Sequence, residues 1–177
     1  MKPVPDLRLD PLRLEDVDPL LAFEQANRAF FEIWINARSP DYYSREGIAR
    51  AIEAAERESA EDRGYQFLIR EHEVLVGRIN LSQLRRTHWQ SASLGYRIGA
   101  DFNGRGIAKA AVQLITQRAF GELALMRLEA HARPENLGSI GALKANGFEQ
   151  FGHSKRSFQL HGQWFDMLYF EANAKPT

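Results

Sequence analysis

Residues 103–108, with the sequence NGRGIA, place two glycines around an arginine directly before an alanine-rich segment. Glycine lets the backbone approach a ligand closely, and the free N–H groups of a first helical turn attract an anion. These residue types therefore favour a phosphate-binding turn, to which the side chains of Arg105 and Lys109 can add contacts. The alternative is an ordinary junction between a loop and a helix, and the segment alone leaves both interpretations open.

Other motifs for phosphate or metal do not fit this chain. Lys109 stands where the dinucleotide fingerprint needs its third glycine, and the spacing of a P-loop is absent. The five histidines lack the spacing of metal-binding motifs. The chain has no cysteine, which excludes disulfides, thiolate zinc sites and a cysteine nucleophile. We therefore expect no bound metal.

Length and charge limit the class of protein. The 177 residues suit one domain over residues 1–177, because no repeat or linker divides them. Lysine and arginine total 23, as do aspartate and glutamate, so no nucleic-acid or membrane partner is expected. The N-terminal residues lack the hydrophobic core of a signal peptide, and no apolar run is long enough to span a bilayer. These features predict a cytoplasmic protein.

The first third of the chain predicts one strand and two helices. Residues 7–14 alternate as in a strand, and the apolar spacing of residues 17–33 is typical of a helix. Asp16 or Asp18 is the expected N-cap of that helix, and Ser44 is the expected N-cap of the next one.

The middle of the chain changes to the period of strands. Residues 65–71 and 74–84 predict a hairpin across His72 and Glu73. Residues 91–100 alternate between apolar and polar side chains and predict a third strand of this group. Three antiparallel strands in a row are therefore expected before the glycine turn.

A strand–helix–strand unit surrounds the glycine turn. Residues 107–120 carry one apolar helical face, and residues 125–133 alternate as a strand. Because a helix connects them, this strand should lie parallel to the strand before the turn. Asn136 is the expected N-cap of the next helix, which residues 146–147 (Asn-Gly) should end in a left-handed turn.

The last segment predicts a second hairpin, formed by residues 149–160 and 163–172. Together these elements predict an α/β (α+β) domain with a mixed, mostly antiparallel sheet of about seven strands and flanking helices.

Three segments in this order resemble the core of the GNAT acetyltransferase superfamily: LGYRIG at 94–99, DFNGRGIAKAA at 101–111, and residues 127–152. The acetyl-CoA loop of that superfamily, Gln/Arg-x-x-Gly-x-Gly/Ala, is matched by residues 103–108, with Asn103 departing at its first position. Asn136 to Ser139 and the late HGQWFDMLYF resemble the Rim-type (RimJ/RimL) ribosomal-protein alanine N-acetyltransferases. The resemblance covers about residues 7–170 and is strongest after residue 90.

The resemblance implies acetyl-CoA as co-substrate and no metal. It implies that a bulge splays the fourth strand from the fifth, and that the pantetheine arm bonds the strand backbone in the gap. The residues that it assigns to acetyl-CoA are Arg97, Ile98, Gly99, Asn103, Gly104, Arg105, Gly106, Ile107, Ala108, Lys109 and Asn136.

The resemblance also assigns catalytic roles to two residues. Asn136 would bond the pantetheine or thioester region, and Ser139 would protonate the leaving thiolate. Many members use a tyrosine nearby for this acid role, and residues 133–147 contain none. Ser139 can alternatively be an ordinary polar residue of a first helical turn.

The family transfers the acetyl group by direct attack of an amine, which must be neutral. The pKa of an α-amine is about 2.5 units below that of lysine, a difference of roughly 3 to 4 kcal/mol. Glu32, Glu129 and Tyr96 are the nearest candidates for a base, and each can equally be structural. The lack of a strong base favours an α-amine over lysine.

The acceptor groove is expected between the first two helices and the late hairpin around Trp164. Its predicted substrate-binding residues are Phe31, Glu32, Trp34 and Tyr96. Packing in the core is the alternative for the aromatic residues Phe30, Phe31 and Trp34.

The favoured function is therefore acetyl transfer to the N-terminal α-amine of a protein, of the ribosomal-protein-alanine type. Acetylation of a small-molecule amine and non-catalytic binding of acyl-CoA are the alternatives. Nothing in the sequence decides between a monomer and a homodimer.

Overall fold

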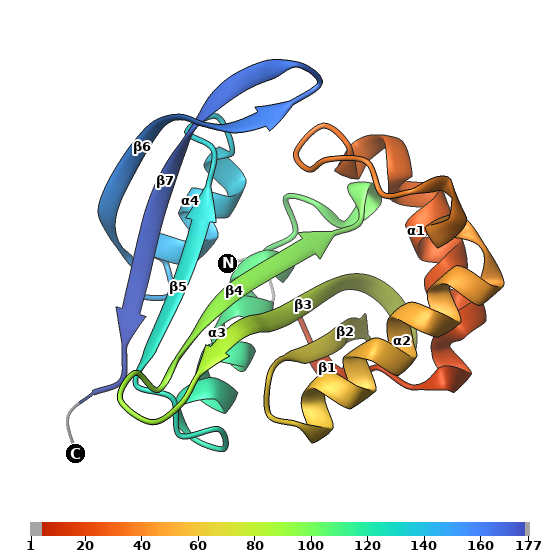
Figure 1. Cartoon of the computed structure of the whole chain (residues 1–177), viewed down its shortest axis with the longest axis horizontal. Coiled ribbons are helices and arrows are strands. Elements are labelled where there is room, and N and C mark those ends of the chain that lie inside the picture. Colours follow the sequence, from red (N-terminus) through yellow and green to blue (C-terminus); the bar gives the residue numbers. More distant parts are fainter. Residues whose placement is uncertain (1–4, 176–177) are drawn as a thin grey trace.

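The computed structural model of the chain describes residues 5–175 and contains one seven-stranded sheet in the order β1-β2-β3-β4-β5-β7-β6 (Figure 1). The strands are β1 (Leu7–Pro11), β2 (Tyr65–Glu71), β3 (Val74–Arg85), β4 (Ser91–Ile98), β5 (Arg127–Ala132), β6 (Glu149–Leu160) and β7 (Gln163–Asn173). The α-helices are α1 (Val17–Phe31), α2 (Arg45–Ala60), α3 (Ile107–Phe120) and α4 (Leu137–Lys144). Short 3-10 turns are η1 (Leu14–Asp16), η2 (Pro40–Tyr43) and η3 (Ala100–Phe102).

The parallel pairing of β4 with β5 confirms the expected strand–helix–strand unit, and all other neighbours are antiparallel. The two parallel strands pair only from Ser91 to Leu94, opposite Arg127 to Ala130. Beyond that point β4 keeps pairing with β3 and β5 keeps pairing with β7, so the two halves of the sheet diverge (Figure 1).

The prediction of a bulge in the fourth strand, β4, is wrong. Between β3 and β4 the one register irregularity of the described residues lies in β3, between Ser82 and Arg85. Along β4 itself the pairing runs regularly from Ser93 to Ile98. The strands separate because each follows its own antiparallel partner, without an extra residue in β4.

The alternation of the strands divides the apolar residues into two cores. The side chains of Leu94 and Ile98 belong to the core with α3, whose Ile107 and Ile115 are buried. Leu68 of β2 belongs to the other core, with the buried residues of α1 and α2. Helices therefore cover both faces of the sheet, α1 and α2 on one and α3 on the other (Figure 1).

The structure confirms two of the three predicted N-caps. The Ser44 side chain accepts a bond from the N–H of Gly47, and the Asn136 side chain accepts one from Ser139, as expected. Gly147 ends α4 in the left-handed region with φ 78°. The prediction that Asp16 or Asp18 caps α1 is wrong, since no side chain caps this helix.

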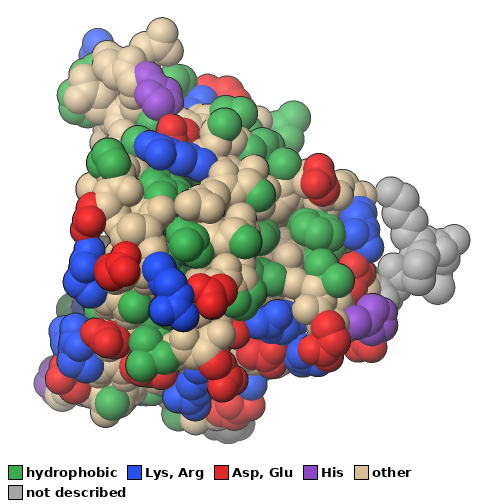
Figure 2. Space-filling view, turned by 90° about the vertical axis from the view of Figure 1, so that its right-hand side faces the viewer, with side chains coloured by type: hydrophobic (Ala, Val, Ile, Leu, Met, Phe, Trp, Pro, Cys, Tyr) green, Lys and Arg blue, Asp and Glu red, His purple; other side chains and the backbone are tan. Residues whose placement is uncertain are grey.

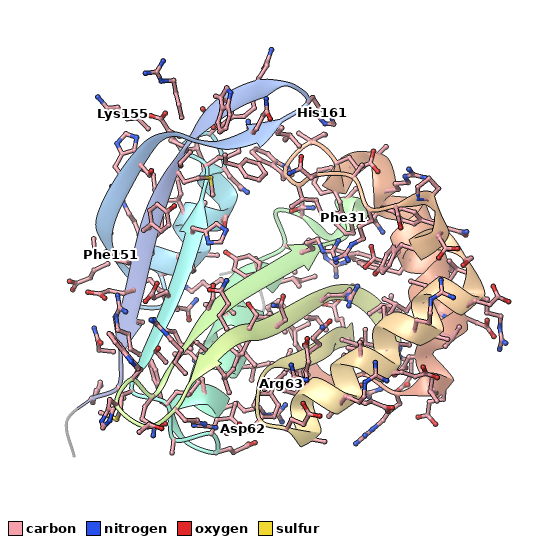
Figure 3. All side chains as sticks on the ribbon, viewed as in Figure 1. Phe31, Asp62, Arg63, Phe151, Lys155 and His161 are labelled. Carbon is pink, nitrogen blue, oxygen red and sulfur yellow. The ribbon has the colours of Figure 1, made fainter. Side chains whose placement is uncertain are left out.

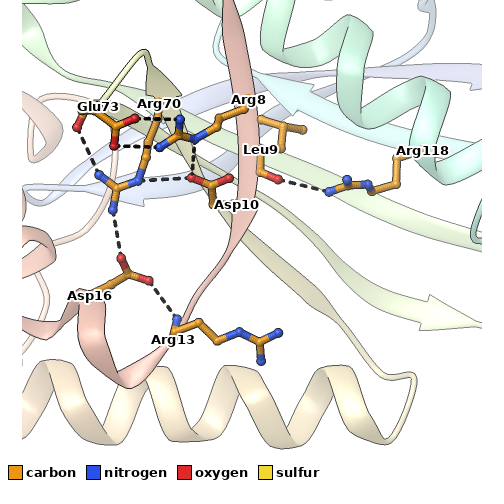
Figure 4. A network of polar contacts seen from close by, with 8 residues as sticks. All are labelled: Arg8, Leu9, Asp10, Arg13, Asp16, Arg70, Glu73 and Arg118. Atoms are coloured by element: carbon orange, nitrogen blue, oxygen red, sulfur yellow. Dashed lines mark hydrogen bonds and ion pairs between the residues drawn. The ribbon is translucent and has the colours of Figure 1, made fainter.

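Asp16 instead connects two parts of the chain (Figure 4). Its Oδ2 accepts the N–H of Arg13 at 3.0 Å, and its Oδ1 accepts a bond from Arg70 of β2 at 2.9 Å. Arg70 also pairs with Asp10 of β1 at 3.3 Å, and Asp18 pairs with Arg45 at 2.8 Å. Both carboxylates are thus used by arginines, which leaves neither for the first turn of α1.

The face that carries α1 and α2 shows charges of both signs interspersed with apolar side chains (Figure 2). This mixture agrees with a formal net charge of zero. Within residues 5–175, no helix is long and apolar enough to cross a membrane, and no group of three metal-binding side chains occurs.

Candidate active site

A cavity of about 640 Å3 lies where β4 and β5 diverge. It reaches from the glycine turn before α3, through the gap in the sheet, to the end of α1 and the β6–β7 hairpin. Its lining includes Phe30, Phe31, Trp34, Ile35, Arg38, Asn80, Tyr96, Arg97, Ile98, Asn103, Gly104, Gly106, Ile107, Ala108, Lys109, His131, Arg133, Asn136, Ser139, Phe158 and Met167. The gap therefore joins both faces of the sheet in one space.

The glycine turn has the conformation that its residue types favour. Gly104 and Gly106 have φ of 73° and 82°, in the left-handed region, and a Cβ at either position would meet no atom within 4 Å. Gly106 precedes α3 without a side-chain cap. Because the first N–H groups of a helix have no intrahelical acceptor, those at the start of α3 can donate to a ligand of this cavity.

The side chain of Asn103 connects the glycine turn to the end of β4. Its Nδ2 donates to the carbonyl oxygens of Gly99 at 2.9 Å and Ala100 at 3.3 Å. The amide thus fixes the chain between β4 and the glycines. Asn103 also lines the cavity.

Three of the predicted site residues do not line the cavity. Arg105 pairs with Glu71 at 2.6 Å, and Glu32 accepts a bond from Arg28 at 2.8 Å. The N–H of Gly99 donates to Val76, which keeps its backbone in the sheet.

Two further predicted groups also lie elsewhere. Trp164 is exposed on the hairpin, whose contribution to the cavity is Phe158 and Met167, and α2 contributes no lining residue. Glu129, one of the candidate bases, pairs with Arg85 and Arg127. The acidic candidates are therefore bound to arginines.

The structure joins Tyr96 of β4 to Ser139 of α4. The hydroxyl oxygens lie 2.8 Å apart, and the Tyr96 hydroxyl also donates to the Ser139 carbonyl at 3.2 Å. Burial raises the pKa of Tyr96 above its usual value, against a smaller opposing effect of Ser139, so the phenol is protonated at neutral pH. Sequence reasoning placed both residues in the site and missed their contact, which bridges 43 positions.

Asn136 orients the same region. Its Oδ1 accepts the N–H of Ser139 at 3.1 Å, which fixes the first turn of α4. Asn136 also lines the cavity. The proton-bearing hydroxyls are thus held by two elements, β4 and α4.

His131 and Arg133 were missed as site residues, although both were placed on one face of the strand. His131 lines the cavity. Partial burial among protein atoms lowers the pKa of its imidazole, so the ring is neutral at pH 7. Arg133 lies 3.8 Å from the ring centre of Phe165 and donates to the carbonyl of Ile33 at 3.1 Å. The strand alternation was the signal that could have identified them.

The hairpin closes the rim of the cavity against α1. His161, at the tip of the hairpin, donates from Nε2 to the carbonyl of Glu32 at 2.8 Å. Phe31, at the end of α1, lies near the end of β4 (Figure 3). Arg97 lies over the Phe31 ring at 5.1 Å. The wall formed by α1 is thus tied to both halves of the sheet.

Glu24 is a fully buried carboxylate beside this wall. Burial opposes its charge, but Arg97 and Arg78 outweigh this effect and hold the pKa of Glu24 below its usual value. Burial also lowers the pKa of Arg97, to about 10. Glu24 follows Leu20 by four positions on the buried stripe of α1, and this spacing was the available signal.

Known proteins share this sequence pattern and fold. A family model described as an acetyltransferase (GNAT) domain matches residues 6–149. The probable N-acetyltransferase YjcK of Bacillus subtilis is 35% identical over 158 residues, which cover 88% of this chain and 87% of that protein. The ribosomal protein uS5-alanine N-acetyltransferase of Escherichia coli is 24% identical over 172 residues, covering 92% and 89%.

A solved structure gives the same result in three dimensions. Mycobacterium smegmatis RimJ in complex with CoA-disulfide has a TM-score of 0.89 and 26% identity, covering 95% of this chain and 82% of that chain. The family model spans most of the chain, and the sheet with its single parallel pair is the one that the resemblance implied. The chain therefore belongs to the GNAT acetyltransferase family and is an N-acetyltransferase.

Proposed function

We propose that this enzyme transfers the acetyl group of acetyl-CoA to the N-terminal α-amine of a protein. The observation that carries the proposal is the Tyr96–Ser139 hydrogen bond of 2.8 Å at the gap between β4 and β5. It places two hydroxyl groups between the glycine turn on one face of the sheet and the neutral His131 on the other. Such a site can hold a donor and an acceptor on opposite sides.

The glycine turn fits the pyrophosphate of acetyl-CoA. Backbone N–H groups at the start of α3 and the positive end of its dipole favour a phosphate, and nothing fills the space beside Gly104 and Gly106. Lys109 lines the same end of the cavity and adds a positive charge. Arg105 supports the turn indirectly, through its pair with Glu71.

The edge of β4 fits the pantetheine arm. Within the described chain, β4 has no partner on its β5 side beyond Leu94, so the backbone of Arg97 and Ile98 is available on that edge. The amide of Asn136 faces the same space. Acetyl-CoA supplies a thioester there, and its sulfur leaves as a thiolate.

Ser139 is the proton donor to this sulfur in our proposal. The neutral Tyr96 phenol, hydrogen-bonded to its Oγ, orients the Ser139 hydroxyl and supplies the replacement proton. The first turn of α4 adds a favourable potential for a developing thiolate. This arrangement gives tyrosine a part in the acid role, although it comes from β4.

His131 is the acceptor of the amine proton in our proposal. Its lowered pKa keeps Nδ1 or Nε2 able to accept a proton at pH 7. A weak base of this kind suits an α-amine, since a lysine side chain would require roughly 3 to 4 kcal/mol more for deprotonation. The name of the Escherichia coli relative supports the same acceptor class.

The test compares acceptors of the two classes. Purified enzyme is incubated with acetyl-CoA and peptides that begin with Ala or Ser, and with the same peptides blocked at the α-amine but carrying lysine. Release of CoA and acetylation of the α-amine, identified by mass spectrometry, are expected only with free N-termini. Turnover of the blocked lysine peptides, or no turnover of any free N-terminus, would contradict the proposal.

A further inference from the structure

A second, smaller cavity of about 150 Å3 adjoins the candidate active site. Its lining residues are Arg38, Gln66, Arg78, Ile79, Asn80, Tyr96 and Arg97. Four of them, Arg38, Asn80, Tyr96 and Arg97, also line the main cavity, so the two cavities share a wall of side chains. Three arginines in so small a volume mark an unusual concentration of positive charge.

Two of these arginines lie side by side on neighbouring strands of the sheet. Arg78 of β3 and Arg97 of β4 are direct partners in the antiparallel register. Like charges opposite one another destabilise a sheet, so this pairing needs a compensating charge. Glu24 of α1 provides one, 2.5 Å from Arg78 and 3.2 Å from Arg97.

The compensation is incomplete. The pKa of Glu24 lies below its usual value, so the group contributes one negative charge against the three arginines. Among the residues that the structure describes, Arg38 has no carboxylate within ion-pair distance and rests on the Tyr42 ring at 4.4 Å. The small cavity therefore carries an excess of positive charge.

Arg97 also has hydrogen-bond donors to spare. The guanidinium of Arg78 makes three hydrogen bonds, from Nη1 to Glu24 and Tyr42 and from Nη2 to Gln66. The side chain of Arg97 makes one hydrogen bond, from Nη2 to Glu24, within residues 5–175, although a guanidinium has five N–H donors. A half-buried cation with free donors is suited to a planar anion.

We propose that Arg97 and Arg38 bind a carboxylate of the amine acceptor. The acceptor class is then a molecule that carries both a primary amine and a nearby carboxylate. This inference rests on the proposed acetyl transfer and adds a specificity determinant to it. The carboxylate can belong to an acidic side chain that follows a peptide N-terminus or to the α-carboxylate of a free amino acid.

The placement of Arg97 argues for the acceptor rather than for CoA. Successive side chains of β4 point to opposite faces of the sheet, so Tyr96 meets α4 while Arg97 meets α1. The glycine turn belongs to α3, on the face away from Arg97. The arginine pair thus lies across the sheet from the proposed phosphate site.

The first arm of the test measures turnover. Paired acceptors differ only in one charge: Ser-Asp and Ser-Asn peptide amides, and alanine and alaninamide. Wild-type kcat/KM should favour the carboxylate member of at least one pair by about tenfold. The pair that shows the preference distinguishes the peptide source from the amino-acid source, and a ratio near one in both pairs overturns the subsite.

The second arm uses variants and a matched control. Arg97→Gln should bring the acid-to-amide ratio close to one, and Arg38→Gln, which replaces an exposed side chain, should lower it about threefold. Arg63→Gln replaces an exposed arginine that lies far from Phe31 (Figure 3) and should keep the wild-type ratio. Unchanged ratios in both cavity variants overturn the subsite, as does a weaker affinity for CoA with an unchanged ratio.

The third arm separates this inference from the proposed function. Binding of the N-acetylated forms of the same molecules to the CoA-loaded enzyme is measured by calorimetry and does not need turnover. Tighter binding of the acidic form that disappears in Arg97→Gln supports the subsite even if no acceptor is acetylated, in which case the proposed function fails alone. Equal binding of both forms overturns the subsite whatever the turnover.

Discussion

Removal of either hydroxyl of the Tyr96–Ser139 pair should slow acetyl transfer without weakening acetyl-CoA binding. The oxygens lie 2.8 Å apart, so each variant interrupts the same path to the leaving sulfur. General acid catalysis contributes about 100- to 10,000-fold, and we expect Ser139→Ala and Tyr96→Phe each to lower kcat by about 100-fold. The double variant should be no slower than the slower single one, because both act on one proton.

The cost in stability should be small. Tyr96→Phe removes the bonds to the Ser139 hydroxyl and carbonyl, which corresponds to about 1 kcal/mol, and leaves the ring in place. Ser139→Ala keeps the N–H that Asn136 accepts. Urea unfolding should therefore show folded proteins, which allows the loss of kcat to be assigned to chemistry.

The assay follows free CoA with a thiol-reactive chromogen, and the chain has no cysteine that would add a background signal. Ser139→Thr, which keeps a hydroxyl, is the matched control and should retain part of the activity. Wild-type kcat in Ser139→Ala would refute the role of Ser139. Multiplicative losses in the double variant would show that the two hydroxyls act on separate steps.

Three further predictions concern other parts of the site. Gly106→Ala, at φ 82°, should raise KM for acetyl-CoA about fivefold at unchanged kcat, because left-handed backbone strain of about 1 kcal/mol acts at the proposed phosphate site. Burial lowers the pKa of His131, so wild-type kcat should persist to a lower pH than an ordinary imidazole base would allow; His131→Gln should lower kcat about 100-fold and remove that inflection from the pH profile. Glu24→Gln should destabilise the fold by about 3 kcal/mol in urea at pH 7, since it leaves the buried Arg78 and the half-buried Arg97 without their carboxylate. The native pKa of Glu24 is lowered, so this difference should be present above the unfolded pKa of about 4.3 and vanish as the pH falls through the native value; a difference that is already absent at pH 7 would contradict it.

The elements that sequence predicted well are those fixed by local signals. The helix over residues 107–120 and the two hairpins have the expected bounds within one or two residues, because glycine turns and changes of period mark their ends. The cap of α1 was mispredicted, since Asp16 is bound by Arg70, 54 positions away. A local pattern carries no information on such a partner.

The same limit applies to the site. The glycine turn could be proposed from sequence because its residue types alone indicate an anion-binding backbone. The Tyr96–Ser139 bond and the position of Glu24 between Arg78 and Arg97 depend on the packing of α4 and α1 against the sheet. Arg105 looked like a ligand-binding residue in sequence, but the structure gives it a nearby carboxylate in Glu71.

The register of β4 determines what each side of the site contains. A shift by one residue would exchange Tyr96 and Arg97 between the two faces, and with them the hydroxyl pair and the arginine pair. β5 pairs with β4 only as far as Leu94, so from there to Ile98 the direct strand partner of β4 is β3. Gly77 of β3 lies opposite Ile98, where a Cβ would come within 2.6 Å of the Arg97 carbonyl oxygen.

The same separation that leaves β4 with one partner also creates the site. An edge strand exposes unpaired N–H and C=O groups, and proteins usually cover such an edge. Here the edge of β4 beyond Leu94 faces the main cavity, between the glycine turn and α4. A ligand with an extended polar arm can complete the strand there, which accounts for an open edge within the sheet. The missing Cβ of Gly77 lets β3 lie close to β4 at Ile98, directly beside this open edge.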